Sequence, residues 1–218
     1  DINNGSDVIG DRAFSQNPHE VIELAKMYCG SMHTAGMKTT AKHYPGHGTV
    51  KADSHHHITR DDRPQHVIEN QDLVPFRTLI TAGQIDAVMM SHVIYSDVDE
   101  QPAGFSPHWI KHLRETVNFN GVIISDDLAM TGATGVGDLK QRYLACREAH
   151  VDLALLCQAD LCNELLSQID YSDAPGYPAT VKRLRQLKGR STLNTDRPFW
   201  EQQRWQQAKN AFNNLQKL

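Results

Sequence analysis

The sequence has few cysteines, and their scarcity excludes one class of small secreted protein. Its 4 cysteines, spread over 218 residues, include no C-x-x-C pair. They are too sparse to build a disulfide framework, and free thiols commonly serve as small apolar side chains. We therefore expect a reducing compartment, and the predicted location is the cytoplasm.

Long hydrophobic runs and an excess of positive charge are also missing. The apolar stretch of residues 151–157 is interrupted by Asp152, and it is far shorter than the roughly 20 residues needed to cross a bilayer. Lys and Arg number 22 against 26 Asp and Glu, which gives a formal net charge of −4. Since no basic run stands out, we predict neither a membrane protein nor a nucleic-acid partner. The one excess is histidine, of which there are 12.

Short apolar runs alternate with segments of helical spacing along most of the chain. The runs, each with the character of a buried strand, are Met37–Tyr44, Ile85–Val93, Val122–Ser125 and Val151–Cys157. Helices are predicted at Pro18–Ala35, with Asn17 as the N-cap, and over residues 67–83 and 139–149. Near-continuous hydrophobic strands separated by helices are typical of parallel βαβ units. The pattern predicts an α/β protein with a parallel sheet.

The end of the chain differs from the rest. Tyr177–Leu187 and Phe199–Leu218 have the pattern of polar helices, joined by a turn-rich segment. Several apolar side chains are available there to pack on the body: Leu184, Leu187, Trp200, Trp205, Phe212 and Leu215. The tryptophan pair could line a sugar or cofactor site, but amphipathic spacing favours core packing. We interpret residues 1–218 as one catalytic domain, of which residues 177–218 form a helical appendage.

Polar side chains gather where three predicted strands end. Lys42 and His43 begin a loop after the first run, His92 follows the second, and Asp126 and Asp127 follow the third. Loops after the strands of a parallel α/β sheet build its active site, so these groups are expected to converge in space.

A metal site is one interpretation of the histidine-rich loop. His43 and His47 are four residues apart, and three more histidines occupy positions 55–57. However, Pro45 and the glycines beside His47 forbid a helix there, and neither an H-E-x-x-H motif nor a nearby cysteine accompanies them. We therefore predict no metal site, and interpret His56 and His57 as exposed loop residues.

Acid–base and nucleophilic catalysis fits the same loops better. Asp53 and His55 are close enough for the carboxylate to set the tautomer of the imidazole and favour its protonated form. A carboxylate such as Asp126, at the end of a buried strand, is costly unless it is paired or used. The alternative role for Asp126 and Asp127 is to cap the following turn. Lys42 and His43 could likewise form a structural ion pair or bind substrate hydroxyls.

The loop motif resembles a known signature. Lys42-His43-Tyr44-Pro45-Gly46-His47-Gly48, followed by Asp53-Ser54-His55, is similar to the motif of the β-N-acetylglucosaminidases of glycoside hydrolase family 3. The resemblance continues at residues 8–15, 35–40, 91–99 and 121–128. It is strongest to the bacterial cytoplasmic enzymes of peptidoglycan recycling, and it implies a TIM (β/α)8 barrel in a single domain.

The resemblance also implies roles for individual residues. Asp126 matches the nucleophile of the family, His55 the acid/base, and Asp53 the residue that orients this histidine. Residues in the matching segments that are expected to bind the sugar are Arg12, Lys42, His43 and His92. A histidine in place of the second carboxylate departs from the usual plan of a retaining glycosidase.

The number of strands departs from that of a complete barrel. A TIM barrel has eight strands in about 250 residues, whereas this sequence has four clear runs. We expect the chain to hold only the second part of the barrel, about strands 4 to 8, with the N-terminal strands missing. Half a barrel exposes two unpaired edge strands and an uncovered hydrophobic core, so the chain alone is not expected to be soluble and stable.

The sequence thus predicts a retaining glycosidase that removes terminal β-linked N-acetylglucosamine from muropeptides. It is expected to act as a monomer on a small carbohydrate, without a metal or organic cofactor. The alternatives are a family 3 β-glucosidase, against which Asp53 and His55 argue, and a non-catalytic sugar-binding fragment. Whether water or phosphate is the acceptor stays open.

Overall fold

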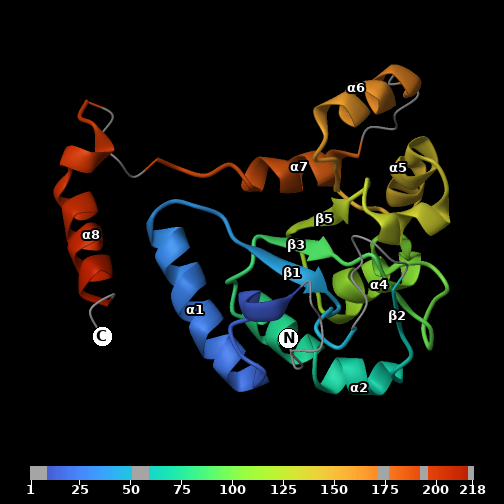
Figure 1. The fold of residues 1–218 in the computed structure, drawn as a ribbon, viewed down its shortest axis with the longest axis horizontal. Helices are drawn as coiled ribbons and strands as arrows, with labels where there is room; N and C mark the ends of the chain where they lie inside the picture. Colours follow the sequence, from blue (N-terminus) through green and yellow to red (C-terminus); the bar gives the residue numbers. More distant parts are fainter. Residues whose placement is uncertain (1–8, 51–58, 171–176, 192–195, 216–218) are drawn as a thin grey trace.

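A parallel sheet lies at the centre of the molecule in a computed structural model, which describes residues 9–50, 59–170, 177–191 and 196–215 (Figure 1). Its strands, in spatial order, are β1 (Thr40–Tyr44), β3 (Ala87–Met90), β5 (Val122–Asp127) and β6 (Leu153–Leu155). Every neighbouring pair in this sheet is parallel. The predicted α/β class and the four predicted strands are confirmed. Within the described residues β1 and β6 are edge strands, so the barrel is not closed.

The second predicted strand, Ile85–Val93, is wrong in its extent. β3 ends at Met90, and a separate strand, β4 (Val93–Tyr95), pairs in parallel with β2 (Thr59–Asp61) in a second small sheet. At the break the backbone of Ser91 still bonds to both sides: its amide donates to the Tyr44 carbonyl over 2.9 Å, and its carbonyl accepts from the Gly104 amide over 2.9 Å. Pairing with β2 therefore divides an apolar run that is continuous in the sequence.

The helices of the first half follow the predicted spacing with one exception. α1 (Pro18–Thr34) starts as expected, with Asn17 Oδ1 accepting from the amide of His19 over 2.9 Å. The segment over residues 67–83 is instead two helices, α2 (Gln65–Asn70) and α3 (Leu73–Thr81). Gln71 leaves the helical region at φ −122° and ψ −74°, and the carboxylate of Asp72 turns toward Arg63. A tertiary ion pair thus accompanies the break.

The second half holds the remaining helices. α5 (Leu139–Glu148) was predicted, whereas α4 (Pro107–Lys111), its π-helical continuation η3 (His112–Thr116) and α6 (Ala159–Gln168) were not. Short 3-10 turns occur at η1 (Gly10–Arg12), η2 (Ala103–Phe105) and η4 (Thr131–Val136). None of the helices in the described segments combines the length and the hydropathy that a bilayer span requires.

The two faces of the sheet are covered differently. Val88, Met90 and Ile123 belong to the largest core cluster, which also contains Trp109 and Tyr95. On the other side, Leu184 and Leu187 from α7 (Pro178–Gln186) and the residue after it pack against a second cluster, which consists of Ala87, Val122 and Ile124. The prediction that these two leucines pack on the body is confirmed, and α7 covers sheet residues that would otherwise be exposed.

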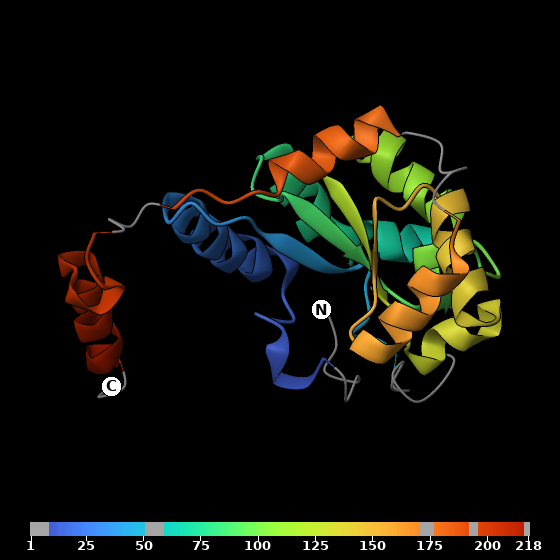
Figure 2. The same cartoon turned by 90° about the horizontal axis from the view of Figure 1, so that it is seen from above.

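The last helical segment does not join the core. η5 (Phe199–Glu201) and α8 (Gln203–Leu215) stand apart from the sheet at the end of an extended stretch (Figures 1 and 2). The side chains predicted to pack there are exposed: Trp200 by 54%, Trp205 by 44%, Phe212 by 60% and Leu215 by 68%. The prediction of core packing is therefore wrong for this segment. An amphipathic pattern shows that a helix has an apolar face but not which surface covers it.

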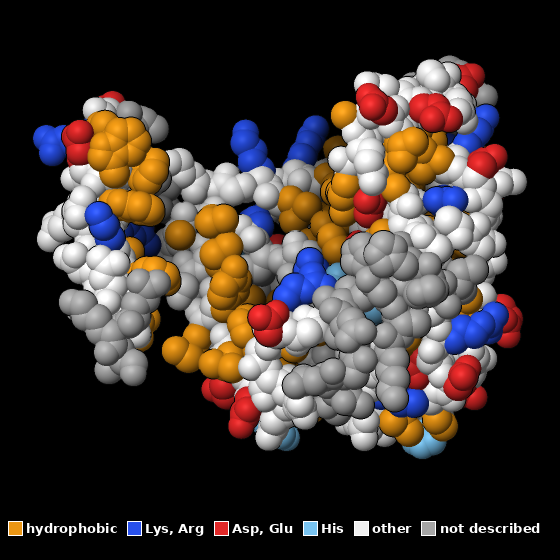
Figure 3. All heavy atoms as spheres, in the orientation of Figure 1, with side chains coloured by type: hydrophobic (Ala, Val, Ile, Leu, Met, Phe, Trp, Pro, Cys, Tyr) orange, Lys and Arg blue, Asp and Glu red, His pale blue; other side chains and the backbone are white. Residues whose placement is uncertain are grey.

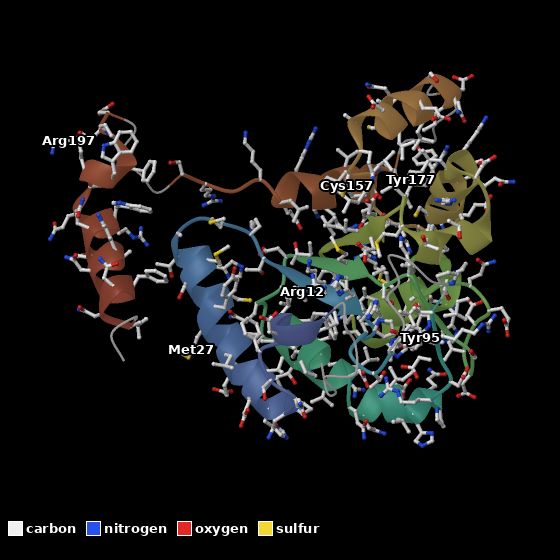
Figure 4. All side chains as sticks on the ribbon, in the orientation of Figure 1. Arg12, Met27, Tyr95, Cys157, Tyr177 and Arg197 are labelled. Atoms are coloured by element: carbon white, nitrogen blue, oxygen red, sulfur yellow. The ribbon has the colours of Figure 1, made fainter. Side chains whose placement is uncertain are left out.

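Hydrophobic side chains on α8 and α1 line the hollow between these two helices (Figure 3). Met27 of α1, which is 72% exposed, lies away from the sheet, and Arg197 lies on the far segment (Figure 4).

Candidate active site

The carboxyl ends of β1 and β5 bring two predicted site residues together. Nε2 of His43 lies 3.7 Å from Oδ2 of Asp126, and the two side chains are only 8% and 13% exposed. These residues are 83 positions apart in the sequence, since one is at position 43 and the other at 126. Parallel pairing of β1 with β3 and of β3 with β5 brings their ends to one edge of the sheet.

The carboxylate of Asp126 is held by its own strand. Oδ1 accepts from the amide of Asp127 over 2.9 Å, while Oδ2 faces His43. The fully buried Ser125 hydroxyl donates to the carbonyl of Asp126 over 2.7 Å and accepts from the amide of Leu155 over 2.9 Å, which joins β5 to β6. The backbone beneath the carboxylate is therefore fixed from both sides, and one carboxylate oxygen is directed toward the site.

Asp127 has the capping role that the sequence allowed for either residue. Its Oδ1 accepts from the amide of Ala129 over 3.1 Å and from that of Cys157 over 3.3 Å. These bonds close the turn after β5 and tie it to the segment after β6. The two adjacent carboxylates therefore have different surroundings: Asp126 faces a histidine, and Asp127 holds backbone amides.

Arg12, Lys42 and His43 line a cavity of about 380 Å³. Side chains of η1, α1, β1 and α3 enclose it, so the cavity lies against the edge strand of the sheet. Arg12 and Lys42 are exposed, and Figure 4 shows Arg12 close to β1. The histidine ring of His43 also contacts that of His47, with ring centroids 5.6 Å apart. The cationic side chains of Arg12 and Lys42 therefore line the same cavity as His43.

His92 occupies a different kind of position. It is fully buried, and its ring stacks on Phe105 at a centroid distance of 4.9 Å and an interplanar angle of 5°. Burial lowers the pKa of the imidazole, although the negative charge of Asp126 opposes this shift. The backbone of Asp126 and of Asp127 faces the ring and, like the charge of Asp126, favours its protonated form. His92 is thus a neutral ring inside the core near Asp126, and its assignment to substrate binding stays a prediction.

The predicted dyad of Asp53 and His55 falls outside the described residues. Val50 and Thr59 are the nearest described positions on either side. Histidines 56 and 57 of the considered metal site fall in the same gap. Within the part of the chain that the structure describes, no group of three or more His, Cys, Asp or Glu side chains could hold a metal ion.

A buried ion cluster, which the sequence does not reveal, lies among the described residues that follow this gap. Arg63 donates from Nη2 to Oδ2 of Asp61 over 2.7 Å and from Nη1 to Oδ2 of Asp72 over 2.9 Å. Burial raises the pKa of both carboxyl groups, but hydrogen bonds from Arg63 bring that of Asp61 below its usual value, whereas that of Asp72 stays raised. In the sequence these three residues have the pattern of an exposed charged loop, so nothing in it predicts that they form a buried cluster.

Comparison with known families decides the classification. Residues 1–186 match the model of the glycosyl hydrolase family 3 N-terminal domain. The chain belongs to glycoside hydrolase family 3. The resemblance inferred from the loop motif is therefore confirmed.

Relatives within the family are longer than this chain. A Beta-hexosaminidase of Tolumonas auensis is 52% identical over 158 residues, which cover 72% of this chain and 47% of the relative. One of Idiomarina loihiensis is 44% identical over 214 residues, covering 96% of this chain and 62% of the relative. The chain thus spans about half to three fifths of the length of the curated relatives it matches.

A solved family 3 structure shares the fold. The crystal structure of NagZ from Neisseria gonorrhoeae, in complex with N-trifluoroacetyl-D-glucosamine, aligns with a TM-score of 0.82 at 37% identity. The alignment covers 96% of this chain and 60% of that one. The predicted fold is confirmed as a parallel α/β sheet that matches part of a TIM-barrel domain.

Proposed function

We propose that this family 3 chain carries the catalytic site of a retaining β-N-acetylglucosaminidase. Its substrate is a muropeptide, from which it removes terminal N-acetylglucosamine linked to anhydro-N-acetylmuramic acid during peptidoglycan recycling in the bacterial cytoplasm. The proposal includes a monomer that needs no metal or organic cofactor. The relatives named Beta-hexosaminidase and the sugar analogue in the gonococcal complex support this choice of substrate class.

The surroundings of Asp126 carry the proposal. A carboxylate at a strand end, with one oxygen fixed by a backbone amide and the other 3.7 Å from His43, suits a nucleophile. A nucleophile must be oriented and remain ionised, and a histidine within reach can donate to a substrate hydroxyl or to the carboxylate. Asp127, with its bonds to Ala129 and Cys157, is occupied in holding the turn.

The reaction proceeds in two steps. Asp126 Oδ2 attacks the anomeric carbon and forms a glycosyl ester, while the bond to the leaving oxygen breaks and His55 delivers a proton to that oxygen. In the second step His55 removes a proton from the acceptor, which attacks the same carbon and releases the sugar from Asp126. Asp53 orients the imidazole and favours its protonated form. The configuration at the anomeric carbon is retained because it is inverted twice.

Sugar recognition falls to residues around the cavity. Arg12 and Lys42 line it with exposed cationic side chains, and their donors suit the hydroxyl and carbonyl oxygens of an N-acetylated sugar. His43 bridges the cavity and Asp126, so it is suited to hold a ring hydroxyl beside the reacting carbon.

A pair of chromogenic substrates tests the proposal. We expect a closed barrel that contains this chain to hydrolyse 4-nitrophenyl N-acetyl-β-glucosaminide and not the corresponding β-glucoside. Preference for the glucoside would favour a family 3 β-glucosidase, and binding of N-acetylglucosamine without turnover would favour a non-catalytic sugar-binding protein. A fluorinated N-acetylglucosaminyl donor that traps the ester is expected to add its mass to the peptide containing Asp126.

A further inference from the structure

We propose that Asp61, Arg63 and Thr49 are positioning residues for the acid/base histidine, because they join the two ends of the segment that carries it. This inference rests on the proposed function, in which His55 transfers the proton. Residues 46–50 lead into that segment from β1, and residues 59–63 lead out of it through β2. The cluster is the place where these two stretches meet.

One hydrogen bond crosses directly from one end to the other. The Thr49 hydroxyl donates to Oδ2 of Asp61 over 3.0 Å. The same carboxylate accepts from Arg63 three times at its side chain, from Nε over 3.0 and 3.1 Å and from Nη2 over 2.7 Å, and once from the Arg63 amide over 3.0 Å. Asp61 therefore holds the chain on both sides of residues 51–58.

The entrance to the segment packs on the other members of the cluster. A Cβ atom at Gly46 would lie 2.6 Å from Oδ1 of Asp72, so the backbone passes directly over this carboxylate. The buried hydroxyl of Tyr95 donates to the Gly46 carbonyl. Arg63 completes the connection by donating to both oxygens of Asp72 over 2.9 and 3.1 Å.

The exit is fixed by the small sheet. Asp61 is the last residue of β2 and pairs with Tyr95 of β4, and its carbonyl accepts from the Ser96 amide over 3.1 Å. Tyr95 thus contacts the entrance through its hydroxyl and the exit through its backbone. Figure 4 shows Tyr95 on the side of the molecule where β2 lies.

The composition of the cluster points to positioning more than to stability. Asp61 and Asp72 have side chains only 4% and 2% exposed, against 24% for Arg63. Removing charges from water is costly, and a buried ion pair is often no more stabilising than apolar residues of the same shape. Such a cluster instead fixes the relative orientation of its members, because the planar guanidinium binds two carboxylates at once. A misplacement of about 1 Å at a catalytic group can cost about 100-fold in rate.

Thr49→Val tests the connection with the least disturbance, because it removes one hydroxyl and leaves the three charges paired. We expect kcat/KM to fall about tenfold for an N-acetylglucosaminide with a poor leaving group, and less than about twofold for the 4-nitrophenyl substrate. An activated phenol departs with little protonation, so only the first substrate depends on the placed histidine. Thr49→Ser, which keeps the hydroxyl, is expected to restore the wild-type ratio.

Thr180→Val is the matched control. The Thr180 hydroxyl donates over 2.9 Å to Asp152, another buried carboxylate held by arginine, but at the amino end of β6. Thr180→Val loses the same kind of bond and, in addition, an acceptor for Nη2 of Arg183 at 3.1 Å. A general loss of stability would therefore affect it at least as much as Thr49→Val. We expect Thr180→Val to leave the ratio of the two kcat/KM values unchanged. An equal effect of the two variants on that ratio would overturn the proposal.

A second measurement does not depend on activity. The amides of Val50, bonded to the His47 carbonyl over 3.2 Å, and of Arg63 report on the two ends of the segment. We expect Thr49→Val to accelerate hydrogen exchange at both, and Thr180→Val at neither. Unchanged exchange would overturn the positioning role. Accelerated exchange in a protein inactive on both substrates would instead retain the connection and refute the proposed function.

Discussion

Replacing Asp126 by asparagine separates its chemical role from its structural one. Asparagine keeps an oxygen that can accept from the Asp127 amide, now 2.9 Å from Oδ1, and loses only the charge facing His43 at 3.7 Å. The Asp127 amide then donates to a neutral oxygen instead of a charged one, which is expected to lower stability by about 1 kcal/mol. For a chain of this size that change shifts Tm by roughly 2–4 °C. Removal of a nucleophile, in contrast, is expected to lower kcat/KM by at least about 10⁴-fold, equivalent to about 5 kcal/mol.

The neighbouring carboxylate provides the control for this experiment. Asp127→Asn also keeps an oxygen for the amides of Ala129 and Cys157, which now bond to Oδ1 over 3.1 and 3.3 Å. We expect it to lower stability by about 1–2 kcal/mol, because two charge-assisted bonds become neutral ones, and activity by less than about tenfold. Hydrolysis of the 4-nitrophenyl substrate, a thermal melt and calorimetric binding of N-acetylglucosamine measure the three effects. If Asp127→Asn abolishes activity while Asp126→Asn does not, the assignment of the pair is refuted.

Three further predictions concern the acid/base histidine, the ion pair of Asp152 with Arg183, and the contact between the Gly46 backbone and Asp72. His55→Ala is expected to slow substrates with poor leaving groups far more than 4-nitrophenyl ones in kcat/KM measured across pH, and equal losses would mean that it binds sugar. Asp152→Ala removes the carboxylate to which Nη2 of Arg183 donates over 2.6 Å. Urea unfolding is expected to show that the free energy of unfolding falls by about 3 kcal/mol, and a fall below about 1 kcal/mol would contradict a role for this pair in stability. Gly46→Ala places Cβ 2.6 Å from Oδ1 of Asp72, so both the melting temperature and the activity are expected to fall, and a variant as stable as wild type would show that the loop adapts.

Local sequence signals located most of the regular structure. Asn17 followed by Pro18 predicts the start of α1 because an amide side chain caps the helix and proline fits its first turn, and the structure has that start. The apolar run at Val122–Ser125 predicts β5, since a strand buried on both faces needs no alternation. In each case the deciding interactions lie within a few residues of one another.

The elements whose extent was predicted wrongly depend on contacts with other segments of the chain. The break between α2 and α3 involves Asp72 and Arg63, which are nine residues apart, and the division of the Ile85–Val93 run depends on pairing of β4 with β2. The apolar face of α8 predicted packing, yet Trp205 is 44% exposed, because the pattern of one helix contains no information about the surface opposite it.

The candidate site divides in the same way. Consecutive residues were enough to predict the family, the four runs that contribute the main sheet, and the place of Asp126 and Asp127 at a strand end, because a motif and an apolar run are local properties of the chain. Contacts between distant elements show that Asp126 faces His43 while Asp127 accepts from backbone amides, and that Asp61 binds both Thr49 and Arg63. The sequence does not distinguish the two adjacent aspartates. They differ because parallel strand pairing places a histidine beside one carboxylate and backbone amides beside the other.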